Sequence, residues 1–362
     1  MIKPHQFIAL AAATGLSVLA TLGLYAGVNS WSAGKVEGAA FLPELSQKIN
    51  AVSAIEVTHG AKKLTLDRVG ERWIVRERGG YPAKADAARA LLVTLAQSQL
   101  VEPKTSVKDR LGLLELEDPA GKDAKSRGVR VLDISGKPIS EIVLGKTRGD
   151  AFGSGKGGAY VRRANETRSW LATGDARVSA DIKDWIDTKV VSTEAAKVLR
   201  LTIENPGEEA LVIEKAPPEA KEEAAKDAKA APMSPMTPPA KASKYRLAKM
   251  PDGQKLKKDA AIDQIVEAFG AIDLDDVRKL DPTPAADKTS TMKLESEGGA
   301  TITFRLRRDA DASWVSLVAA GEGDAKKAAD EINARTSGWE FKLPGWKADQ
   351  IGKRRADLFE TS

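Results

Sequence analysis

Cysteine and histidine, two side chains common in nucleophilic and metal chemistry, are nearly missing from this sequence of 362 residues. Cysteine is absent, which excludes disulfides, thiolate metal sites, iron–sulfur clusters and cysteine nucleophiles. Histidine occurs only at His5 and His59, so a metal site with many histidine ligands cannot form, and a histidine-based triad would have to use His59. His59 stands beside Gly60 at the end of a predicted strand, and no nucleophile motif lies near it. We therefore interpret His59 as a structural residue.

The segment Phe152–Tyr160 (FGSGKGGAY) has the composition of a phosphate-binding loop but not its spacing. A Walker-type loop has four residues between its first glycine and the Gly-Lys pair, which Ser or Thr follows. Here the interval from Gly149 to Gly155 is one residue longer, and Gly157 follows Lys156. The segment also joins two predicted strands, whereas a phosphate loop opens a helix. It is predicted to be a hairpin loop.

Neighbouring charged residues give no specific sign of catalysis or of nucleic-acid binding. The pairs Glu117-Asp118 and Asp275-Asp276 could act as general acid and base, but such neighbours are expected by chance among 51 acidic residues. Lys353-Arg354-Arg355 is interpreted as a solvated helix face, with an acidic partner or anionic lipid as the alternative. The net charge of +5 is spread over the chain, so no nucleic-acid partner is predicted. We predict no catalytic residue, no cofactor-binding residue and no metal ligand.

The clearest functional signal is the uncharged segment Phe7–Val28, which we predict to be a transmembrane helix. At 1.5 Å per residue it would extend about 33 Å, enough for a hydrocarbon core of about 30 Å. Lys3 precedes it, and Tyr25 and Trp31 lie near its far end, where amphipathic rings suit the interface. The positive-inside bias favours a cytoplasmic N-terminus, with the rest of the chain in the bacterial periplasm.

Two other interpretations of this segment stay open. A cleaved signal peptide has a shorter apolar region and a small-x-small site, and Leu24-Tyr25-Ala26 fits that site poorly. A buried core helix is the third interpretation. The anchor and the signal peptide both place the remaining chain outside the cytoplasm.

Beyond the anchor, short strands outnumber helices and short turns join most of them, which predicts an α+β fold of antiparallel sheets, each with a packed helix. In the first part of the chain, Ala88, Leu91, Leu92 and Leu95 have the spacing of one helix face. A terminal helix is predicted over residues 344–359. The strands are predicted at residues 54–58, 64–66, 73–75, 129–132, 139–144, 159–161, 169–171, 199–203, 211–213, 245–247, 291–294, 301–306 and 313–318. Six tryptophans are interpreted mainly as core residues, with glycan stacking as the alternative: Trp73, Trp170, Trp185, Trp314, Trp339 and Trp346.

The same unit is predicted to occur twice. In the second part of the chain, Ile262, Ile265, Val266 and Phe269 repeat the helix-face spacing. Ala216–Ser243 is rich in alanine and proline without apolar periodicity, so it is predicted to be a disordered insertion in a hairpin loop. Removing it gives the intervals from Val57 to Trp73 and from Leu201 to Tyr245 the same length, which matches Val57 with Leu201. The predicted organisation is an anchor over residues 1–31, a first α+β repeat over 32–191 and a second over 192–362.

Several short motifs together resemble a known family. The motifs that carry the resemblance are Leu42-Pro43-Glu44-Leu45, Gly80-Tyr81-Pro82-Ala83, Glu117-Asp118-Pro119, Tyr160-Val161-Arg162-Arg163 and Ser169-Trp170-Leu171. The chain resembles a bacterial family of domains of unknown function, whose members carry an N-terminal membrane helix and a duplicated extracytoplasmic domain. Its members are often encoded beside gliding-motility-type ABC transporter permeases and auxiliary subunits. The resemblance implies no active site.

The expected function is that of a non-enzymatic accessory subunit, anchored in the inner membrane and associated with such a transporter. Two alternatives stay open: an anchored periplasmic hydrolase that uses carboxylates, and a free-standing envelope binding or scaffold protein. A deep pocket lined by paired acids with raised pKa values would favour the hydrolase. A smooth surface with an apolar patch would favour the accessory subunit.

Overall fold

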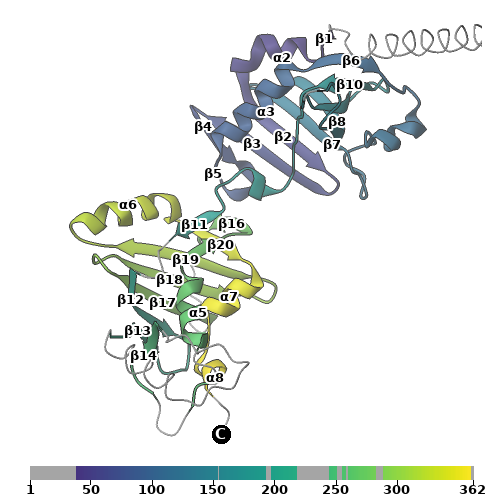
Figure 1. Cartoon of the computed structure of the whole chain (residues 1–362). Helices are drawn as coiled ribbons and strands as arrows, with labels where there is room; N and C mark the ends of the chain where they lie inside the picture. Colours follow the sequence, from purple (N-terminus) through teal and green to yellow (C-terminus); the bar gives the residue numbers. More distant parts are fainter. Residues whose placement is uncertain are drawn as a thin grey trace, which may run out of the picture. The chain divides into compact units, whose positions relative to one another are not determined.

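Antiparallel sheets dominate the α+β fold of the protein (Figure 1). The computed structural model describes residues 38–153, 155–192, 197–217, 244–250, 255–257, 260–282 and 288–359. The described part forms two units. The first holds residues up to Trp73 together with Ala85–Asp181, and the second holds Ile74–Lys84 together with residues from Ile182 on.

The first unit is built on a sheet with the strand order β1-β6-β10-β9-β8-β7-β2-β3-β4-β5. Strand β4 begins in the first unit and ends within segment Ile74–Lys84, which contains all of β5. The elements are β1 (Ala39–Ala40), α2 (Pro43–Lys48), β2 (Val52–His59), β3 (Lys62–Val69), β4 (Arg72–Val75), β5 (Tyr81–Ala83), α3 (Ala85–Gln97), β6 (Gln99–Pro103), the 3₁₀ helix η3 (Lys108–Leu114), β7 (Arg127–Asp133), β8 (Pro138–Arg148), β9 (Gly158–Arg163) and β10 (Trp170–Thr173).

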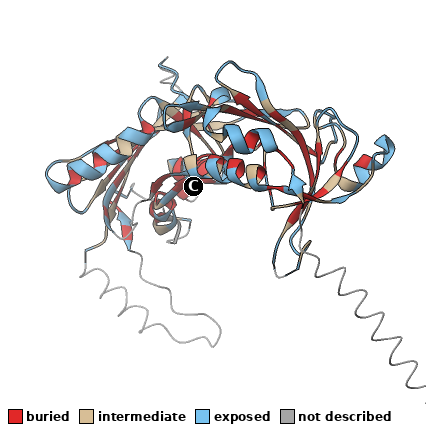
Figure 2. Cartoon of the chain, turned by 90° about the horizontal axis from the view of Figure 1, so that it is seen from above, coloured by how far each residue is buried: buried red, intermediate tan, exposed pale blue. Residues whose placement is uncertain are grey.

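One face of this sheet forms the main core of the first unit. Ile55 and Val57 of β2 are fully buried, as are Val129 and Val131 of the neighbouring β7. The predicted face of α3 is confirmed, because Ala88, Leu91, Leu92 and Leu95 are all buried. Figure 2 shows how the buried residues concentrate on the sheet and on the inner sides of the helices. Burial of these aliphatic side chains supplies the main stabilisation of the unit.

The second unit is built on a sheet with the order β14-β13-β12-β17-β18-β19-β20-β16, and β11 and β15 pair as a separate ribbon. The predicted helix face is again buried, and Phe269 at the end of α5 contacts Phe304 of β18 with ring centroids 5.2 Å apart. The elements are η4 (Ile182–Asp184), β11 (Lys189–Ser192), β12 (Val198–Glu204), β13 (Leu211–Lys215), β14 (Tyr245–Leu247), α5 (Ala260–Ala268), β15 (Ala271–Asp273), β16 (Asp276–Lys279), β17 (Thr289–Ser296), β18 (Thr301–Arg308), β19 (Ser313–Ala320), α6 (Asp324–Thr336), β20 (Trp339–Leu343), α7 (Gly345–Ile351) and α8 (Arg355–Leu358).

The two sheets place corresponding strands in the same order. The series β6-β10-β9-β8-β7-β2-β3-β4 of the first sheet matches β16-β20-β19-β18-β17-β12-β13-β14 of the second. Both sheets also have a register shift at the start of their central strand, between Val52 and Ala54 and between Val198 and Arg200. These shifts match Ile55 with Leu201, so the match of Val57 with Leu201, which was inferred from spacing alone, is wrong by two positions.

The predicted terminal helix, hairpin insertion and membrane anchor compare with the structure in different ways. The terminal helix predicted over residues 344–359 is two short helices, α7 and α8, because the chain leaves helical geometry at Gly352. The hairpin around the insertion is confirmed, since β13 and β14 pair antiparallel, but residues 218–243 of Ala216–Ser243 lie outside the described residues. Phe7–Val28 also lies outside them, and none of the helices in the described ranges has the length and apolar character needed to span a bilayer.

Segment Ile74–Lys84 contributes to the core of the second unit, although it runs from the end of strand β4 through β5 to the residue before helix α3. The Tyr81 ring packs edge-on against Trp339 at a centroid distance of 4.9 Å and against Phe341 at 6.2 Å. Arg78 donates two hydrogen bonds to the Asp276 carboxylate, from Nε at 2.6 Å and from Nη2 at 3.0 Å. The second unit is therefore completed by residues from an early part of the chain.

Helix α6 covers part of the free edge of strand β19. Strand β20 pairs with β19 only at Ser313, Trp314 and Val315, and α6 lies beside the rest of that strand. The Asn333 side chain accepts a hydrogen bond from the Ala319 N–H at 2.9 Å and donates one to the Ala319 carbonyl at 2.8 Å. Asn333 thus satisfies the two backbone groups that a further strand would otherwise bind.

Replacing Asn333 with alanine is expected to lower the free energy of unfolding by about 1–3 kcal/mol, because two backbone groups of Ala319 lose their partner. The exposed edge should also increase concentration-dependent association. Chemical denaturation and light scattering measure the two effects. Ala334→Ser on the exposed side of α6 is the control, and equal behaviour of both variants would contradict the edge-covering role.

Candidate functional site

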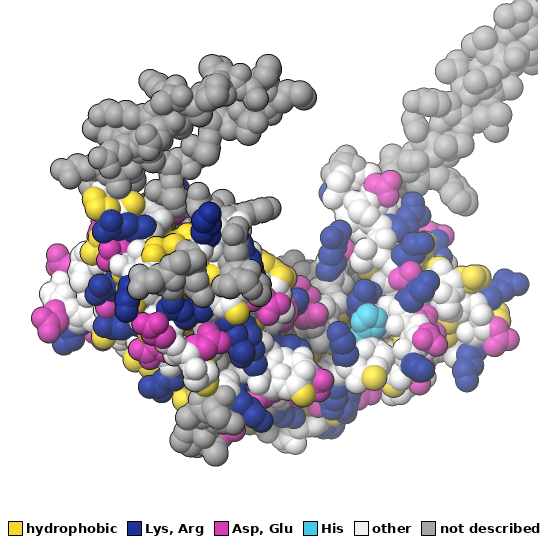
Figure 3. Space-filling view, turned by 90° about the horizontal axis from the view of Figure 1, so that it is seen from below, with side chains coloured by type: hydrophobic (Ala, Val, Ile, Leu, Met, Phe, Trp, Pro, Cys, Tyr) yellow, Lys and Arg dark blue, Asp and Glu magenta, His cyan; other side chains and the backbone are white. Residues whose placement is uncertain are grey.

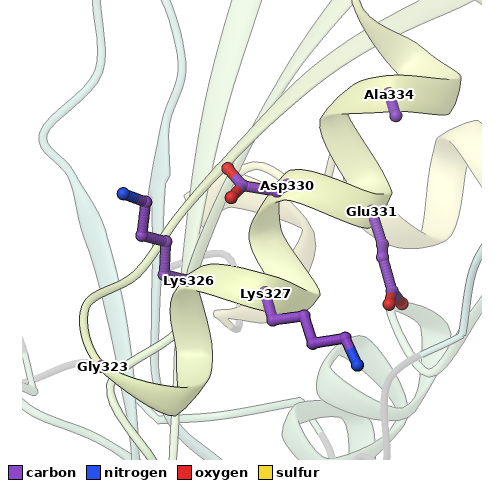
Figure 4. Close-up of a pocket in the computed structure, with 6 residues that line it drawn as sticks. All are labelled: Gly323, Lys326, Lys327, Asp330, Glu331 and Ala334. Carbon is purple, nitrogen blue, oxygen red and sulfur yellow. The ribbon is translucent and has the colours of Figure 1, made fainter.

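The outer face of α6 forms a shallow depression that is not a convincing binding site (Figure 4). All the residues around it belong to α6, except Gly323 just before the helix; they include Lys326, Lys327 and Asp330. Among the residues that the structure describes, no second element supplies an opposing wall that would enclose a ligand there.

The first unit contains a better candidate, a cavity of about 560 Å³ on the face of its sheet that is opposite the main core. We call it the sheet cavity. Its floor consists of residues from β2, β7 and β8, namely Thr58, Gly128, Arg130, Glu141 and Val143. One wall is the connection between β6 and β7, and the other is the turn after β9. The wall residues used below are Lys108, Leu111, Asp118, Pro119, Asn165, Glu166 and Thr167.

A row of ion pairs crosses the floor of the sheet cavity. Arg130 of β7 donates from Nη1 to Glu56 Oε2 and from Nε to Glu141 Oε1, both at 2.8 Å. Lys63 of β3 lies 3.4 Å from the other oxygen of Glu56, which is buried. The hydrogen bond that Arg130 donates to Glu141 and the charge of Glu56 raise the pKa of Arg130, although burial opposes this. Arg130 therefore stays charged and is held in place by two carboxylates.

Arg162 of β9 fixes both walls of the sheet cavity. Its guanidinium is buried and donates from Nε to the Leu116 carbonyl at 2.8 Å and from Nη1 to the Ala164 carbonyl at 2.9 Å. A further, longer bond from Nη1 reaches the Glu166 carbonyl at 3.3 Å. Burial lowers the pKa of Arg162, and the charges of Asp118 and Glu117 oppose that effect. One side chain thus ties the β6–β7 connection to the turn after β9.

Close packing holds the β6–β7 connection against the sheet. Leu111, Leu116 and Val143 form a small buried cluster, with Leu114 and Tyr160 packed against it. Gly145 is required beneath this cluster, because a Cβ there would lie 2.2 Å from the Leu114 carbonyl oxygen. The walls are therefore held in place by packing within the chain, so a ligand would not have to order them on binding.

Glu117 stabilises the C-terminal end of the β6–β7 connection. Its Oε1 accepts hydrogen bonds from the backbone N–H groups of Lys125 and Ser126. Burial opposes ionisation of the Glu117 carboxyl, but these backbone hydrogen bonds and the Lys125 charge outweigh it and lower the pKa. The ionised form of Glu117 is therefore the one that the folded loop binds.

Folding lowers the pKa of Glu117, so this residue stabilises the folded protein at pH values above its unfolded pKa of about 4.5. The stabilisation is lost as the pH falls through the lower pKa of the folded state. Glu117→Gln is expected to lower stability at neutral pH and to flatten its dependence on pH in the acid range. Urea unfolding between pH 3 and 7 measures both effects. The Glu115→Gln variant is the control, and an unchanged acid slope for Glu117→Gln would contradict the prediction.

The structure places the sequence candidates in structural roles. His59 ends β2 beside the turn to β3, opposite Lys62. The predicted loop Phe152–Tyr160 lies between β8 and β9 and enters β9 at Gly158, so the segment is followed by a strand and not by a helix; Ser154 lies outside the described residues. Asp118 accepts the backbone N–H of Ala120 at 3.0 Å, whereas Glu117 binds other backbone groups, so the two adjacent carboxylates have separate partners.

The remaining charged candidates are also bound to other groups. Asp275 lies 3.2 Å from Lys183 Nζ, and Asp276 binds Arg78. In the basic cluster, Arg354 lies 3.8 Å from Glu208 and Arg355 lies 3.3 Å from Glu209. These contacts favour a solvated, ion-paired surface for that cluster.

The tryptophans are not all core residues. Trp73 and Trp185 are buried as predicted, but Trp346 is 62 % exposed, which corrects its assignment to the core. Trp314 is half-buried, and the guanidinium of Arg278 lies over its ring at 3.8 Å. The same guanidinium binds the buried Glu340 at 2.8 Å. The charge of Arg278 is therefore paired within the second sheet, and we interpret its contact with Trp314 as structural.

The described residues hold no cluster of metal ligands, and one face of the molecule carries charges of both signs. Within the described ranges, no group of three or more histidine and carboxylate side chains could hold a metal ion. On the face that Figure 3 presents, acidic and basic side chains are interspersed. This distribution differs from the concentrated basic face typical of nucleic-acid binding.

The residues that form the sheet cavity were not among the candidate site residues predicted from the sequence. Glu56, Arg130 and Arg162 alternate along their strands with buried apolar residues, and that alternation was available as a signal. Their meeting depends on the pairing of β2 with β7 and on a loop that folds back over β8 and β9. Strand register is set by the whole sheet, so the sequence pattern alone could not place them together.

Comparisons with known proteins identify a family but no function. A family model described as "Domain of unknown function (DUF4340)" matches residues 73–297, which is more than half of the chain. No curated protein and no solved structure matches the chain.

Proposed function

The chain belongs to the DUF4340 family of domains of unknown function, and from this premise we propose that it is a non-enzymatic accessory subunit anchored in the bacterial inner membrane. Its two units would lie in the periplasm and bind the permease or auxiliary subunits of a gliding-motility-type ABC transporter. Residues 7–28 would provide the anchor, as the uncharged sequence of this segment indicates.

The observation that carries this proposal is the state of the acidic groups in the sheet cavity. Glu141 is bound by Arg130, and Asp118 accepts a backbone N–H. Glu166 lies 3.4 Å from Arg163. A general acid or base needs a carboxylate that can exchange its proton with a substrate, often with a shifted pKa. The cavity instead presents an ion-paired lining of the kind that recognises a partner by shape and charge.

Duplication of one unit also supports a binding role. We interpret the two units as copies of one ancestral domain, because their strands follow the same order and their central strands share a register shift. The second copy keeps the framework but lacks the charged row of the first. By register, Thr202 matches Glu56 and Lys293 matches Arg130. A shared framework with different surfaces is suited to contacts with different partner subunits.

A membrane anchor would strengthen the association of the two units with transporter subunits even if each contact has only modest affinity. Tethering the units to the membrane that holds the transporter raises their effective concentration near it, so avidity can exceed the affinity of the periplasmic contact. The proposal therefore needs no large hydrophobic interface on the described units.

Co-purification from native membranes tests this proposal. The full-length chain with a C-terminal affinity tag is expected to recover ABC transporter permease or auxiliary subunits after mild detergent extraction, as identified by mass spectrometry. A tagged chain in which an unrelated transmembrane helix replaces residues 7–28 should still recover them, because the contact is assigned to the periplasmic units. Recovery of no transporter subunit would contradict the proposal. Turnover of an envelope substrate by the purified chain would favour the hydrolase instead.

A further inference from the structure

We propose that the sheet cavity of the first unit binds an extended peptide segment of a partner protein, in which a single carboxylate lies beside an apolar side chain. This inference rests on the proposed accessory function and assigns its docking site.

The dimensions and rigidity of the sheet cavity suit a short peptide segment. A volume of about 560 Å³ lies within the range of about 300–1,000 Å³ that is typical of ligand pockets. Arg162 ties both walls through backbone carbonyls, and Pro119 packs on Gly128, where a Cβ would lie 3.1 Å from the proline ring. The site would therefore need little reorganisation on binding.

The groups that stay available in the sheet cavity are mainly hydrogen-bond donors. Lys108 has no hydrogen-bond or ion-pair partner among the described residues, and Arg130 uses Nε and Nη1 but not Nη2 in its ion pairs. The carboxylates of Glu141, Asp118 and Glu166 already accept from partners. The lining thus has spare capacity to donate to an anionic oxygen.

The rest of the lining limits the kind of anion. Three carboxylates stand around the cavity, so the double charge of a phosphate monoester would meet repulsion that a single carboxylate among neutral amides largely avoids. Leu111, Pro119 and Val143 offer apolar contact. Asn165 and Thr167 can bind peptide amides, which a lipid acyl chain does not offer.

The second unit lacks the parts that form the cavity. By register, Ser316 of β19 matches Arg162 of β9, so the buried clamp is absent from the second sheet. The connection between β6 and β7 runs over residues 104–126, whereas its counterpart between β16 and β17 covers only residues 280–288. Folding of the common framework therefore does not require the clamp and the longer wall, which indicates that they serve a specific role in the first unit.

The test uses the full-length chain in phospholipid nanodiscs and fluorescent, blocked hexapeptides with Leu, Val or Phe at the third position and Glu at the fourth. Fluorescence anisotropy is expected to show saturable binding of at least one Glu peptide. Its Gln counterpart should bind about tenfold more weakly, because a charged hydrogen bond is lost. Lys108→Glu should remove this preference, and Thr167→Trp should weaken both peptides by occupying the cavity.

Lys122→Glu and Lys122→Trp are the matched controls, because Lys122 is exposed on the same connection but does not line the cavity. Unfolding midpoints establish that each variant is folded. The inference is overturned if no Glu peptide binds at 1 mM, if Glu and Gln peptides bind equally, or if the Lys122 variants match the cavity variants. Binding of anionic vesicles or inorganic phosphate that depends on Lys108, without peptide binding, would assign the site to another ligand.

The inference and the proposed function can fail separately. Selective peptide binding supports the inference even if no transporter subunit co-purifies. Absence of peptide binding overturns it even if transporter subunits do co-purify, and the docking surface then lies elsewhere on the chain.

Discussion

Replacing Tyr81 with alanine is expected to lower the free energy of unfolding of the second unit by about 3–5 kcal/mol, the range typical of a buried aromatic side chain. The reason is the position of the Tyr81 ring, which contacts Trp339 at 4.9 Å and Phe341 at 6.2 Å. Burial and the charge of Asp187 raise the pKa of the Tyr81 hydroxyl, while Arg335 opposes them. Removing the ring leaves a cavity beside two large aromatic residues that cannot close easily.

Urea unfolding of the full-length chain in detergent, followed by tryptophan fluorescence, measures this effect. Tyr81→Phe is the control, because it keeps the ring contacts and should cost much less than the alanine variant. If Tyr81→Ala unfolds at the wild-type urea concentration, segment Ile74–Lys84 does not contribute to the second core as described.

Replacing Arg162 with methionine is expected to lower stability by about 3 kcal/mol, because several buried backbone carbonyls lose their donor. Methionine keeps most of the side-chain volume, so the effect reports mainly the hydrogen bonds to Leu116 and Ala164. The walls of the sheet cavity should also separate. We therefore expect faster proteolysis within residues 104–126 and weaker binding of the Glu peptides.

Limited proteolysis with mass spectrometry, combined with urea unfolding, checks the Arg162 prediction. Arg148→Met on the same sheet is the matched control, because Arg148 is exposed and does not line the sheet cavity. Equal cleavage rates and equal stability in the two variants would show that Arg162 does not hold the walls.

Local patterns in the sequence predicted many of the strands and both main helix faces. Alternation placed residues 129–132 and 301–306 correctly in β7 and β18, because these strands bury one face and expose the other. Helix α6 was missed, since its buried residues are Ala325, Ala329 and Thr336 and no large apolar face marks the segment. Strand β20 was also missed, although Trp339, Phe341 and Leu343 alternate along it.

The site was harder to predict than the fold because its parts come from distant strands. The outward positions of Glu56 and Arg130 follow from alternation, but their 2.8 Å contact depends on strand pairing. The role of Arg162 depends on where the β6–β7 connection folds back. The Glu56–Arg130 contact and the bonds of Arg162 depend on tertiary structure, which local composition and periodicity do not encode.

The early position of Tyr81 in the chain also has a consequence for synthesis and for gene rearrangement. Tyr81 leaves the ribosome long before Trp339 and Phe341, so completion of the second core must wait until those two residues have been synthesised. Such a contact between distant parts of the chain closes a long loop, which slows the last stage of folding. A single recombination point near Asp181 would separate segment Ile74–Lys84 from its partners. The two units therefore cannot be exchanged between related genes as simple, consecutive modules.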